Sequence, residues 1–362
     1  MAATPARRPR LLAGWGGGGE LAARPDGGLS GRIALTGGGG FIGSHLATWL
    51  RAAGAEVLLL GPPPLRSAAS RSLVERGEAR WERRALVEGR ARLTTLLKGA
   101  QALVHLGYRP PRGEGALLAL RSELTGNVLA TARLLEAAAD AGLAYVVFAS
   151  SAQVYPPREG NREDGPVAPS TPYAWAKLLQ EELVRGWAQD LGRPAAVLRL
   201  ATVYGPGEPP RRAIPRFVKA ALEGRPLHVD GRGDHRFAPV FVADVVAAFA
   251  AALRARADGT YNVAGQPRTI REVAELVVAL CGTEVPIEES GSAPRQVPLC
   301  DVSKAERALG LSWTALEVGL QEEIRWFRQR LPATLSRPSR SPGEGDLASG
   351  EPGGTSVPHR VG

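Results

Sequence analysis

The sequence predicts an α/β protein in which a doubly wound parallel sheet is followed by a smaller mixed α/β lobe. From residue 32 to about residue 200, short apolar runs alternate with longer amphipathic runs. Such alternation is typical of a parallel sheet with helices on both faces. Beyond residue 203 the order becomes irregular, which indicates a second lobe. A chain of 362 residues is long enough to bury a full core.

Each expected element follows from its local pattern. Strands are expected where short apolar runs rich in Val, Ile and Leu occur, and helices where apolar residues recur with helical spacing. The expected strands are 32–36, 56–60, 102–106, 145–150 and 195–200. The expected helices are 41–53, 117–141 and 172–191, then 214–223, 242–254, 270–281 and 315–328 in the second lobe. This order is that of a Rossmann-type sheet.

The ends of the chain differ from its middle. Residues 1–30 are rich in Gly, Pro and Arg, and residues 332–362 are rich in Pro, Ser and Gly, so both are expected to be disordered tails. Between them we expect a sheet domain over 31–202 and a second lobe over 203–331. Ligands of such sheets bind at the carboxyl ends of the strands, so the loops after the strands should form the site.

Composition argues against several classes of protein. The net charge of +9 comes mostly from arginines that are spread along the chain without interleaved aromatics, which does not favour a nucleic-acid surface. No apolar run reaches the length of a membrane span. We expect no secretory signal, because no clean apolar core and cleavage site follow the basic start. Cys281 and Cys300 have no metal-ligand spacing and are expected to be buried thiols, with a single disulfide as the alternative. We therefore expect a cytoplasmic protein without a metal site.

A glycine turn lies between the first strand and the first helix. Gly37, Gly40 and Gly43 have G-x-x-G-x-x-G spacing, which chance alone would give about 0.65 times in so glycine-rich a chain. The informative part is the context, because the glycines follow RIALT and open a helix. There they allow a tight turn and a close approach to a pyrophosphate at the helix N-terminus. The alternative is a tight strand–helix turn without a ligand.

A tyrosine and a lysine lie four residues apart on an expected helix. Tyr173 and Lys177 share one helix face, and chance predicts only about 0.07 such pairs. An ammonium group and an oxidised nicotinamide would lower the pKa of the phenol, which could then take a proton from an alcohol. Ser150 or Ser151, at the end of a strand, would hold the same oxygen. The alternative is a core tyrosine beside a solvated lysine.

Motifs in order along residues 31–330 resemble the extended short-chain dehydrogenase/reductase family, also called the NAD-dependent epimerase/dehydratase family. The matching stretches are TGGGGFIGSHL, NVLATARLLEAA, FASSAQVY, TPYAWAKLLQEEL, LRLATVYGPG, YNVAG and DVSKAERALG. The resemblance implies Ser151, Tyr173 and Lys177 as catalytic residues, and Arg236 and Arg295 as contacts of a nucleotide-sugar substrate. It implies that NAD or NADP binds at Gly37, Gly40, Phe41, Ile42, Gly43, Arg66, Leu106 and Lys177.

Several positions depart from the family pattern. The acid that usually ends the second strand and binds the adenosine ribose is replaced by Gly61. Without it, discrimination against a 2′-phosphate weakens, and Arg66 or Arg83 could favour NADP. Gly107-Tyr108 replaces a pair of alanines, and Ala238 and Thr202 replace an acid and an asparagine near the expected substrate cleft. The choice between NAD and NADP therefore stays open.

The residues after Ser151 narrow the reaction. Sugar dehydratases of the family carry an acidic pair there, but this chain has Ala152-Gln153, which cannot do acid–base work. Dehydration is disfavoured, and a nucleotide-sugar 4-epimerase becomes the first hypothesis. An NADP-dependent reductase of a keto sugar or other small carbonyl is the second, and a non-catalytic dinucleotide-binding protein the third. The resemblance also implies a homodimer formed through helices 117–141 and 172–191.

Overall fold

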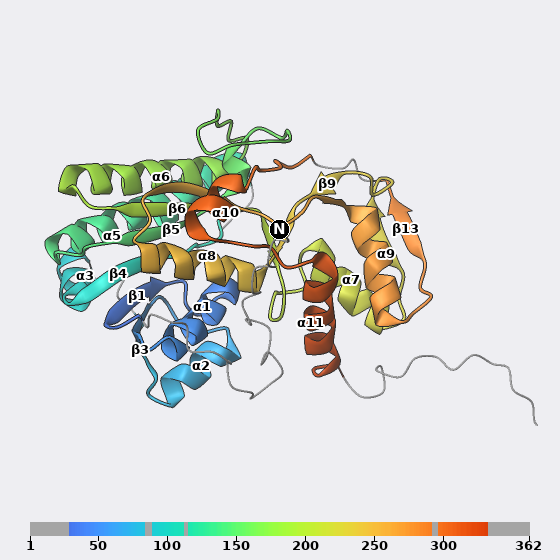
Figure 1. Cartoon of the computed structure of the whole chain (residues 1–362), viewed down its shortest axis with the longest axis horizontal. Coiled ribbons are helices and arrows are strands. Elements are labelled where there is room, and N and C mark those ends of the chain that lie inside the picture. The colour runs from blue at the N-terminus through green and yellow to red at the C-terminus, as the bar shows by residue number, and fades with distance from the viewer. Residues whose placement is uncertain (1–28, 84–88, 112–114, 292–295, 332–362) are drawn as a thin grey trace, which may run out of the picture.

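The computed structural model of this chain describes residues 29–83, 89–111, 115–291 and 296–331. A large sheet with flanking helices forms one part, and a smaller lobe with helices α7, α9 and α11 lies beside it (Figure 1). Apart from residues 29 and 30, the two expected tails lie outside the described residues.

The large sheet has seven parallel strands in the order β11-β6-β5-β4-β1-β2-β3. Their side chains are mostly buried, and β5 and β6 are buried throughout, as in parallel strands covered on both faces. The strand order reverses between β1 and β4, which makes their carboxyl ends the expected ligand crevice. The expected Rossmann-type fold is confirmed. The strands are β1 (Arg32–Thr36), β2 (Glu56–Leu60), β3 (Ala79–Glu82), β4 (Ala100–His105), β5 (Val146–Ser151), β6 (Ala195–Leu200) and β11 (Gly259–Val263).

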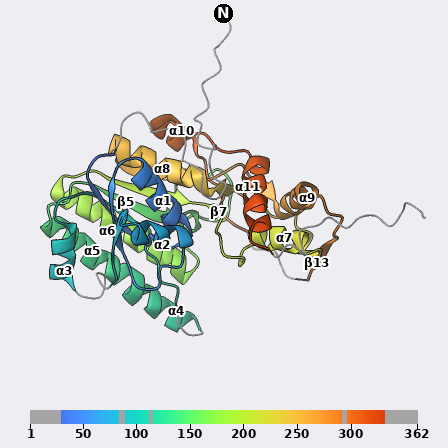
Figure 2. The ribbon, with the colours of Figure 1, turned by 90° about the horizontal axis from the view of Figure 1, so that it is seen from below.

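Helices cover both faces of this sheet (Figures 1 and 2). One face is covered by α1 (Phe41–Ala52), with α2 (Ala68–Glu75) and α8 (Val242–Ala255) packed against it. The other face is covered by α3 (Arg90–Leu97), α5 (Leu129–Asp140) and α6 (Pro172–Leu191). Each layer of helices packs against the sheet to form its own apolar core, and the core on the α1 side continues into the smaller lobe.

The expected helix 117–141 is present but contains an irregular turn. It consists of α4 (Ala116–Glu123), a π-helical turn at Leu124–Val128 and then α5. A π-helical turn holds more residues than an α-turn and so changes the direction of the side chains around it. The sequence predicted the helix but not this turn, because the apolar pattern runs through it unbroken.

The chain crosses between the two parts more than once. The smaller lobe holds α7 (Ala213–Leu222), α9 (Ile270–Cys281) and α11 (Leu316–Arg328), with β8 (Leu227–Asp230) paired to β13 (Ile287–Ser290). Residues 203–331 were expected to form one lobe, but α8 packs on α1 and β11 pairs with β6. The remaining elements are β7 (Thr202–Tyr204), β9 (Arg236–Phe237), β10 (Pro239–Phe241), β12 (Arg268–Thr269) and α10 (Ser303–Leu309).

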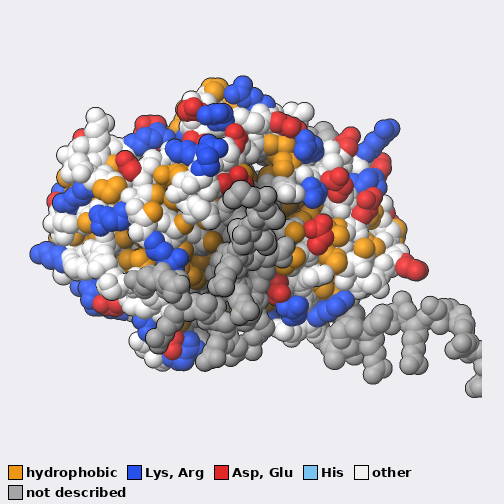
Figure 3. Space-filling view, in the orientation of Figure 1, with side chains coloured by type: hydrophobic (Ala, Val, Ile, Leu, Met, Phe, Trp, Pro, Cys, Tyr) orange, Lys and Arg blue, Asp and Glu red, His pale blue; other side chains and the backbone are white. Residues whose placement is uncertain are grey.

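The two thiols agree with the expectation only in part, because Cys300 is not buried. Basic and acidic side chains lie interspersed on the face shown in Figure 3. Both Cys281 and Cys300 are free thiols rather than a disulfide, and Cys281 is buried while Cys300 is partly exposed. Among the described residues, no helix combines the length and the apolar character needed to span a membrane.

Candidate active site

The glycine turn joins β1 to α1 and packs tightly against the end of β4. Gly37 has φ +72°, and a Cβ there would lie 2.7 Å from the backbone of Leu106. A Cβ on Gly43 would lie 2.2 Å from the carbonyl oxygen of Gly37. Neither position can hold a side chain without backbone movement, so these glycines are required by packing as well as by any ligand.

The N-terminus of α1 is open to a ligand. Its N-cap is Gly40, no side chain caps it, and its first turn holds no acid. The first amides of a helix lack partners within the helix and carry partial positive charge. Phe41, Ile42 and Gly43, which supply these amides, line a cavity. The turn therefore fits the pyrophosphate of a dinucleotide, as its sequence context predicts.

This cavity has a volume of about 510 Å³ and lies at the carboxyl ends of the central strands. It joins the glycine turn to the residues expected to be catalytic and to the segment after β7. Of the residues expected at the site, those that line the cavity are Gly37, Gly40, Phe41, Ile42, Gly43, Leu106, Ser151, Tyr173 and Lys177. Thr202 and Ala238, noted above as departures from the family pattern, line it as well.

Local structure places Tyr173 and Lys177 beside this cavity. The Thr171 hydroxyl accepts a hydrogen bond from the Ala174 amide, and Pro172 starts α6. Tyr173 therefore lies in the first turn and Lys177 one turn later on the same face. The Lys177 ammonium is buried and donates a 2.8 Å hydrogen bond to the carbonyl of Ala149 in β5.

The two candidate serines have different partners. Ser150 donates to the buried carboxylate of Glu181, which Arg199 also binds through two nitrogens at 3.0 and 2.7 Å. The Ser151 hydroxyl instead accepts a 3.2 Å hydrogen bond from the Gln153 amide, and it also lowers the pKa of Tyr173. Both serines line the cavity, but Ser151 is the one that acts on the tyrosine, while Ser150 belongs to the buried network of Glu181 and Arg199.

Burial dominates the ionisation of this pair. It raises the pKa of Tyr173, against smaller lowering effects from the Ser151 hydrogen bond and the charge of Arg212. Burial also lowers the pKa of Lys177 to about 8, while the nearby carboxylates of Glu123 and Glu181 oppose that change. The phenol is thus desolvated and the Lys177 ammonium is engaged by Ala149, and the lowering of the Tyr173 pKa expected beside an oxidised nicotinamide stays a prediction.

Sequence reasoning missed several charged residues at this site. Glu208, Arg211 and Arg212, in the segment between β7 and α7, line the cavity. Glu123, at the end of α4, is buried beside Tyr108. A run of charged residues in a loop, or a glutamate on a helix, normally indicates solvent exposure. Only the sheet topology brings these segments to the strand ends.

Two residues expected at the site, Arg66 and Arg236, do not line the cavity as the described residues form it. Arg66 lies in the segment against the glycine turn, because a Cβ on Gly39 would lie 3.7 Å from the Arg66 amide nitrogen, but its side chain is exposed. Arg236 forms an ion pair with Glu159 on the surface. Arg295 lies outside the described residues.

The end of β2 is open, as the loss of the usual acid there predicts. Gly61 follows this strand, and a Cβ on it would meet nothing within 4 Å. The Gly61 carbonyl accepts a 3.1 Å hydrogen bond from the indole of Trp81, and Arg83 lies over that indole. There is thus open space, and no carboxylate, at residue 61.

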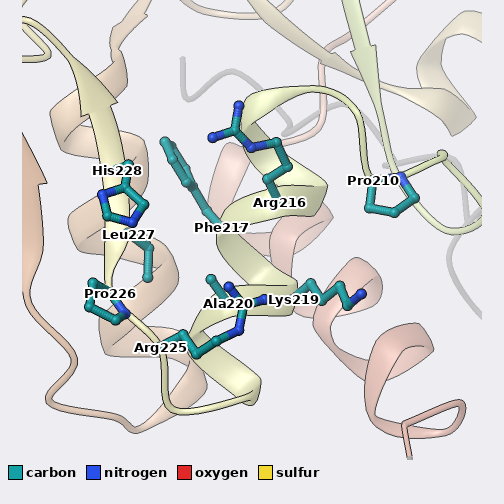
Figure 4. Close-up of a pocket in the computed structure, with 9 residues that line it drawn as sticks. All are labelled: Pro210, Arg216, Phe217, Lys219, Ala220, Arg225, Pro226, Leu227 and His228. Atoms are coloured by element: carbon teal, nitrogen blue, oxygen red, sulfur yellow. The ribbon is translucent and has the colours of Figure 1, made fainter. Parts of the chain in front are cut away.

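Figure 4 shows a second, smaller cavity, which has a volume of about 250 Å³. Its basic side chains are Arg216 and Lys219 on α7, Arg225 in the turn after α7, and His228 on β8. Because Pro209 lines one cavity and Pro210 the other, a single segment forms a wall of both.

Known proteins with similar sequence or structure agree on one family. Residues 33–264 match the NAD dependent epimerase/dehydratase family. An uncharacterized UDP-glucose epimerase, YtcB of Bacillus subtilis, is 29% identical over 82% of this chain and 98% of its own length. A dTDP-4-dehydro-6-deoxy-D-allose reductase of Streptomyces bikiniensis is 30% identical over 82% of this chain and 96% of its own length.

A solved structure agrees as well. A mutant of UDP-glucuronic acid 4-epimerase from Bacillus cereus, in complex with UDP-4-deoxy-4-fluoro-glucuronic acid and NAD, has a TM-score of 0.75 and 27% identity. It covers 83% of this chain and all of its own. Together with the cavity that joins the glycine turn to Tyr173, these matches show that the chain is an enzyme of the NAD dependent epimerase/dehydratase family.

Proposed function

We propose that this enzyme is an NAD(P)-dependent nucleotide-sugar 4-epimerase. The observation that carries the proposal is the shared cavity, which is lined both by the open N-terminus of α1 and by Ser151, Tyr173 and Lys177. The relatives named as epimerases act on UDP-sugars, which supports the same substrate class here. The bound cofactor would supply the hydride acceptor and, later, the hydride donor.

The chain's own residues would then move one proton. Tyr173 takes the proton of the C4 hydroxyl, and Ser151 holds the same sugar oxygen by a hydrogen bond. The Lys177 ammonium and the cofactor's positive charge favour the phenolate against its burial. After the keto sugar has turned and presents the other face of C4 to the hydride, Tyr173 returns the proton to the C4 oxygen. Ala152 and Gln153 offer no acid at the position where the dehydratases of the family carry their acidic pair, which disfavours elimination of water.

The nucleotide end of the substrate would extend toward the second cavity. A nucleotide sugar carries a diphosphate between its sugar and its nucleoside, and guanidinium groups suit phosphate oxygens. Arg211 and Arg212 line the first cavity, and Arg216 and Arg225 line the second (Figure 4). We therefore propose that the diphosphate lies along the segment before α7.

A reduction of a keto sugar is the second candidate. It is favoured by Gly61, because the open end of β2 does not exclude the 2′-phosphate of NADP. One relative is named as a reductase of a dTDP-keto sugar. Net consumption of NADPH would support this candidate, whereas inversion at C4 without net change in the cofactor supports the epimerase.

The decisive experiment compares the wild-type enzyme with Tyr173→Phe on a panel of UDP- and dTDP-sugars, with NAD and with NADPH. We expect the wild type to invert C4 and the variant to lose about 10²- to 10⁴-fold in turnover, the usual contribution of a general base. The melting temperature of the variant should stay close to that of the wild type. Unchanged turnover in Tyr173→Phe would refute the mechanism.

We also propose a homodimer and a cytoplasmic location. Large apolar side chains are exposed on the outer faces of α4 and α6, where Leu117 is 78% and Trp175 50% exposed. A second copy of this face would cover them. Two free thiols and a need for nucleotide sugars and NAD(P) fit the reducing cytoplasm.

A further inference from the structure

Glu123 is a buried carboxylate beside the candidate active site. It ends α4, is 1% exposed, and both of its oxygens accept hydrogen bonds. The Tyr108 hydroxyl donates to Oε1 at 2.6 Å, and the Asn127 amide donates to Oε2 at 2.7 Å. A carboxylate this deep in the protein persists only when such partners compensate its lost hydration.

The partners of Glu123 are themselves held in place. Asn127 lies in the π-helical turn, and its side chain makes two hydrogen bonds, of 2.8 and 2.9 Å, to the backbone of Arg109. Tyr108 precedes Arg109 in the segment after β4, so the helix and this segment are joined at two neighbouring residues. The π-helical turn thus has a definite use, because it places Glu123 and Asn127 toward the same short segment.

The ring of Tyr108 connects these hydrogen bonds to the candidate active site. It lines the cavity and meets the ring of Tyr173 edge to face, with the centroids 5.1 Å apart and the planes at 88°. The Lys177 nitrogen lies 5.8 Å from the Tyr108 centroid. Burial and the Glu123 hydrogen bond raise the pKa of Tyr108 far above its usual value, so this phenol is not a second base.

Charged and polar groups on several elements face Tyr173 and Lys177. Arg212 approaches Tyr173 from the segment before α7, and the Ser151 hydroxyl approaches it from β5. Glu181, on α6 itself, and His105, on β4, face Lys177. Glu123 is the one group here that acts on both, because its charge raises the pKa of Tyr173 and that of Lys177.

We propose that Glu123 and Tyr108 are positioning residues of the active site. The carboxylate fixes the Tyr108 ring, the ring holds the Tyr173 phenol toward Ser151, and the negative charge keeps Lys177 in its ammonium form. This inference rests on the proposed function, in which Tyr173 is the base. Tyr108 departs from the family pattern, in which an alanine usually stands at this position.

The test uses two variants, each of which removes a different property of the Glu123–Tyr108 pair, and one matched control. Glu123→Gln keeps the size of the side chain but removes its charge, whereas Tyr108→Phe keeps the ring but removes its hydrogen bond. Glu136→Gln removes a charge from the exposed part of the same long helix, where Glu136 pairs with Arg90. All are compared as full-length protein loaded with NAD.

The pH dependence separates a positioning role from a merely structural one. In Glu123→Gln we expect the rise of kcat/KM with pH to move to lower pH by about one unit, because the charge opposing the phenolate is gone. In Tyr108→Phe we expect kcat to fall about 10-fold at unchanged KM, because only the orientation of the Tyr173 phenol is lost. The rise of kcat/KM with pH should not move to lower pH in this variant. The Glu136→Gln profile should equal that of the wild type.

A second measurement needs no sugar substrate. The ionisation of Tyr173 is followed by the ultraviolet absorbance of phenolate, as the difference between each protein and its Tyr173→Phe counterpart. A pKa lowered in Glu123→Gln relative to both wild type and Glu136→Gln supports the inference. An unmoved pKa overturns it, even where no sugar is turned over and the proposed function has failed. Variants that lose stability but keep the pH profile of the wild type would equally overturn the inference.

Discussion

Two glutamates meet in the interior between the segment after β7 and helix α11. Glu208 is 5% exposed, its Oε2 has no hydrogen-bond partner among the described residues, and its Oε1 lies 3.8 Å from the Nε of Arg212. Glu323 is fully buried, and neither of its carboxylate oxygens has a described partner. Burial raises the pKa of Glu208 to about 8, and burial together with the Glu208 charge raises that of Glu323 well above 4.5.

These pKa values make stability depend on pH. Between a pKa of 4.5 unfolded and about 8 folded, Glu208 binds more protons in the folded state, so the free energy of unfolding falls as pH rises through this window. Integrated to pH 7, the effect of Glu208 alone is about 3 kcal/mol. Below the pKa of the unfolded state, the Glu208 carboxyl is neutral in both states, so its ionisation no longer changes the free energy of unfolding.

We therefore expect Glu208→Gln to stabilise the protein at neutral pH. The gain should approach about 3 kcal/mol near pH 7 and vanish near pH 4, since the amide resembles the neutral acid. Urea unfolding, followed by tryptophan fluorescence across this range, measures it. Glu75→Gln, at an exposed position on α2, is the control for loss of charge. A variant whose stability declines with pH as steeply as the wild type would refute the reasoning.

Two further predictions concern the glycine turn and the proposed dimer. Gly43→Ala should weaken NAD(P) binding and lower stability by about 1–3 kcal/mol, because its Cβ would strike the Gly37 backbone. In Gly40→Ala the nearest atom lies at 3.3 Å, so its unfolding midpoint should stay near that of the wild type; similar losses in both would contradict the packing argument. Trp175→Arg, on the exposed face of α6, should give monomers by sedimentation without unfolding, and an unchanged sedimentation coefficient would count against this face.

Local patterns predicted most of the fold. The strand at residues 32–36 and the helices at 172–191 and 270–281 have the expected bounds, because buried strands and amphipathic helices are encoded by short-range periodicity. The spacing of Tyr173 and Lys177 placed both on one helix face for the same reason. The residues that Tyr173 and Lys177 contact from other strands and helices could not be predicted from the sequence, because those contacts depend on the sheet topology.

The parts missed are those decided by long-range contacts. The burial of Glu123, Glu208 and Glu323 depends on segments distant in sequence, and a glutamate gives no local sign of being buried. The desolvation of Tyr173 was missed for the same reason. The phenol's desolvation depends on walls contributed by Tyr108 and by the segment before α7, and spacing along α6 contains no information about them.

The position of β11 has a consequence for how the chain folds during synthesis. This strand pairs with β6, yet more than fifty residues, including α7 and α8, separate the two in sequence. Until residues 259–263 leave the ribosome, β6 presents an unpaired edge, and until residues 242–255 have left it α8 cannot cover α1. The cofactor-binding half therefore cannot finish folding as an independent N-terminal unit. A nascent chain that stops after residue 202 should resemble an aggregation-prone intermediate, and sheet and lobe should mature together.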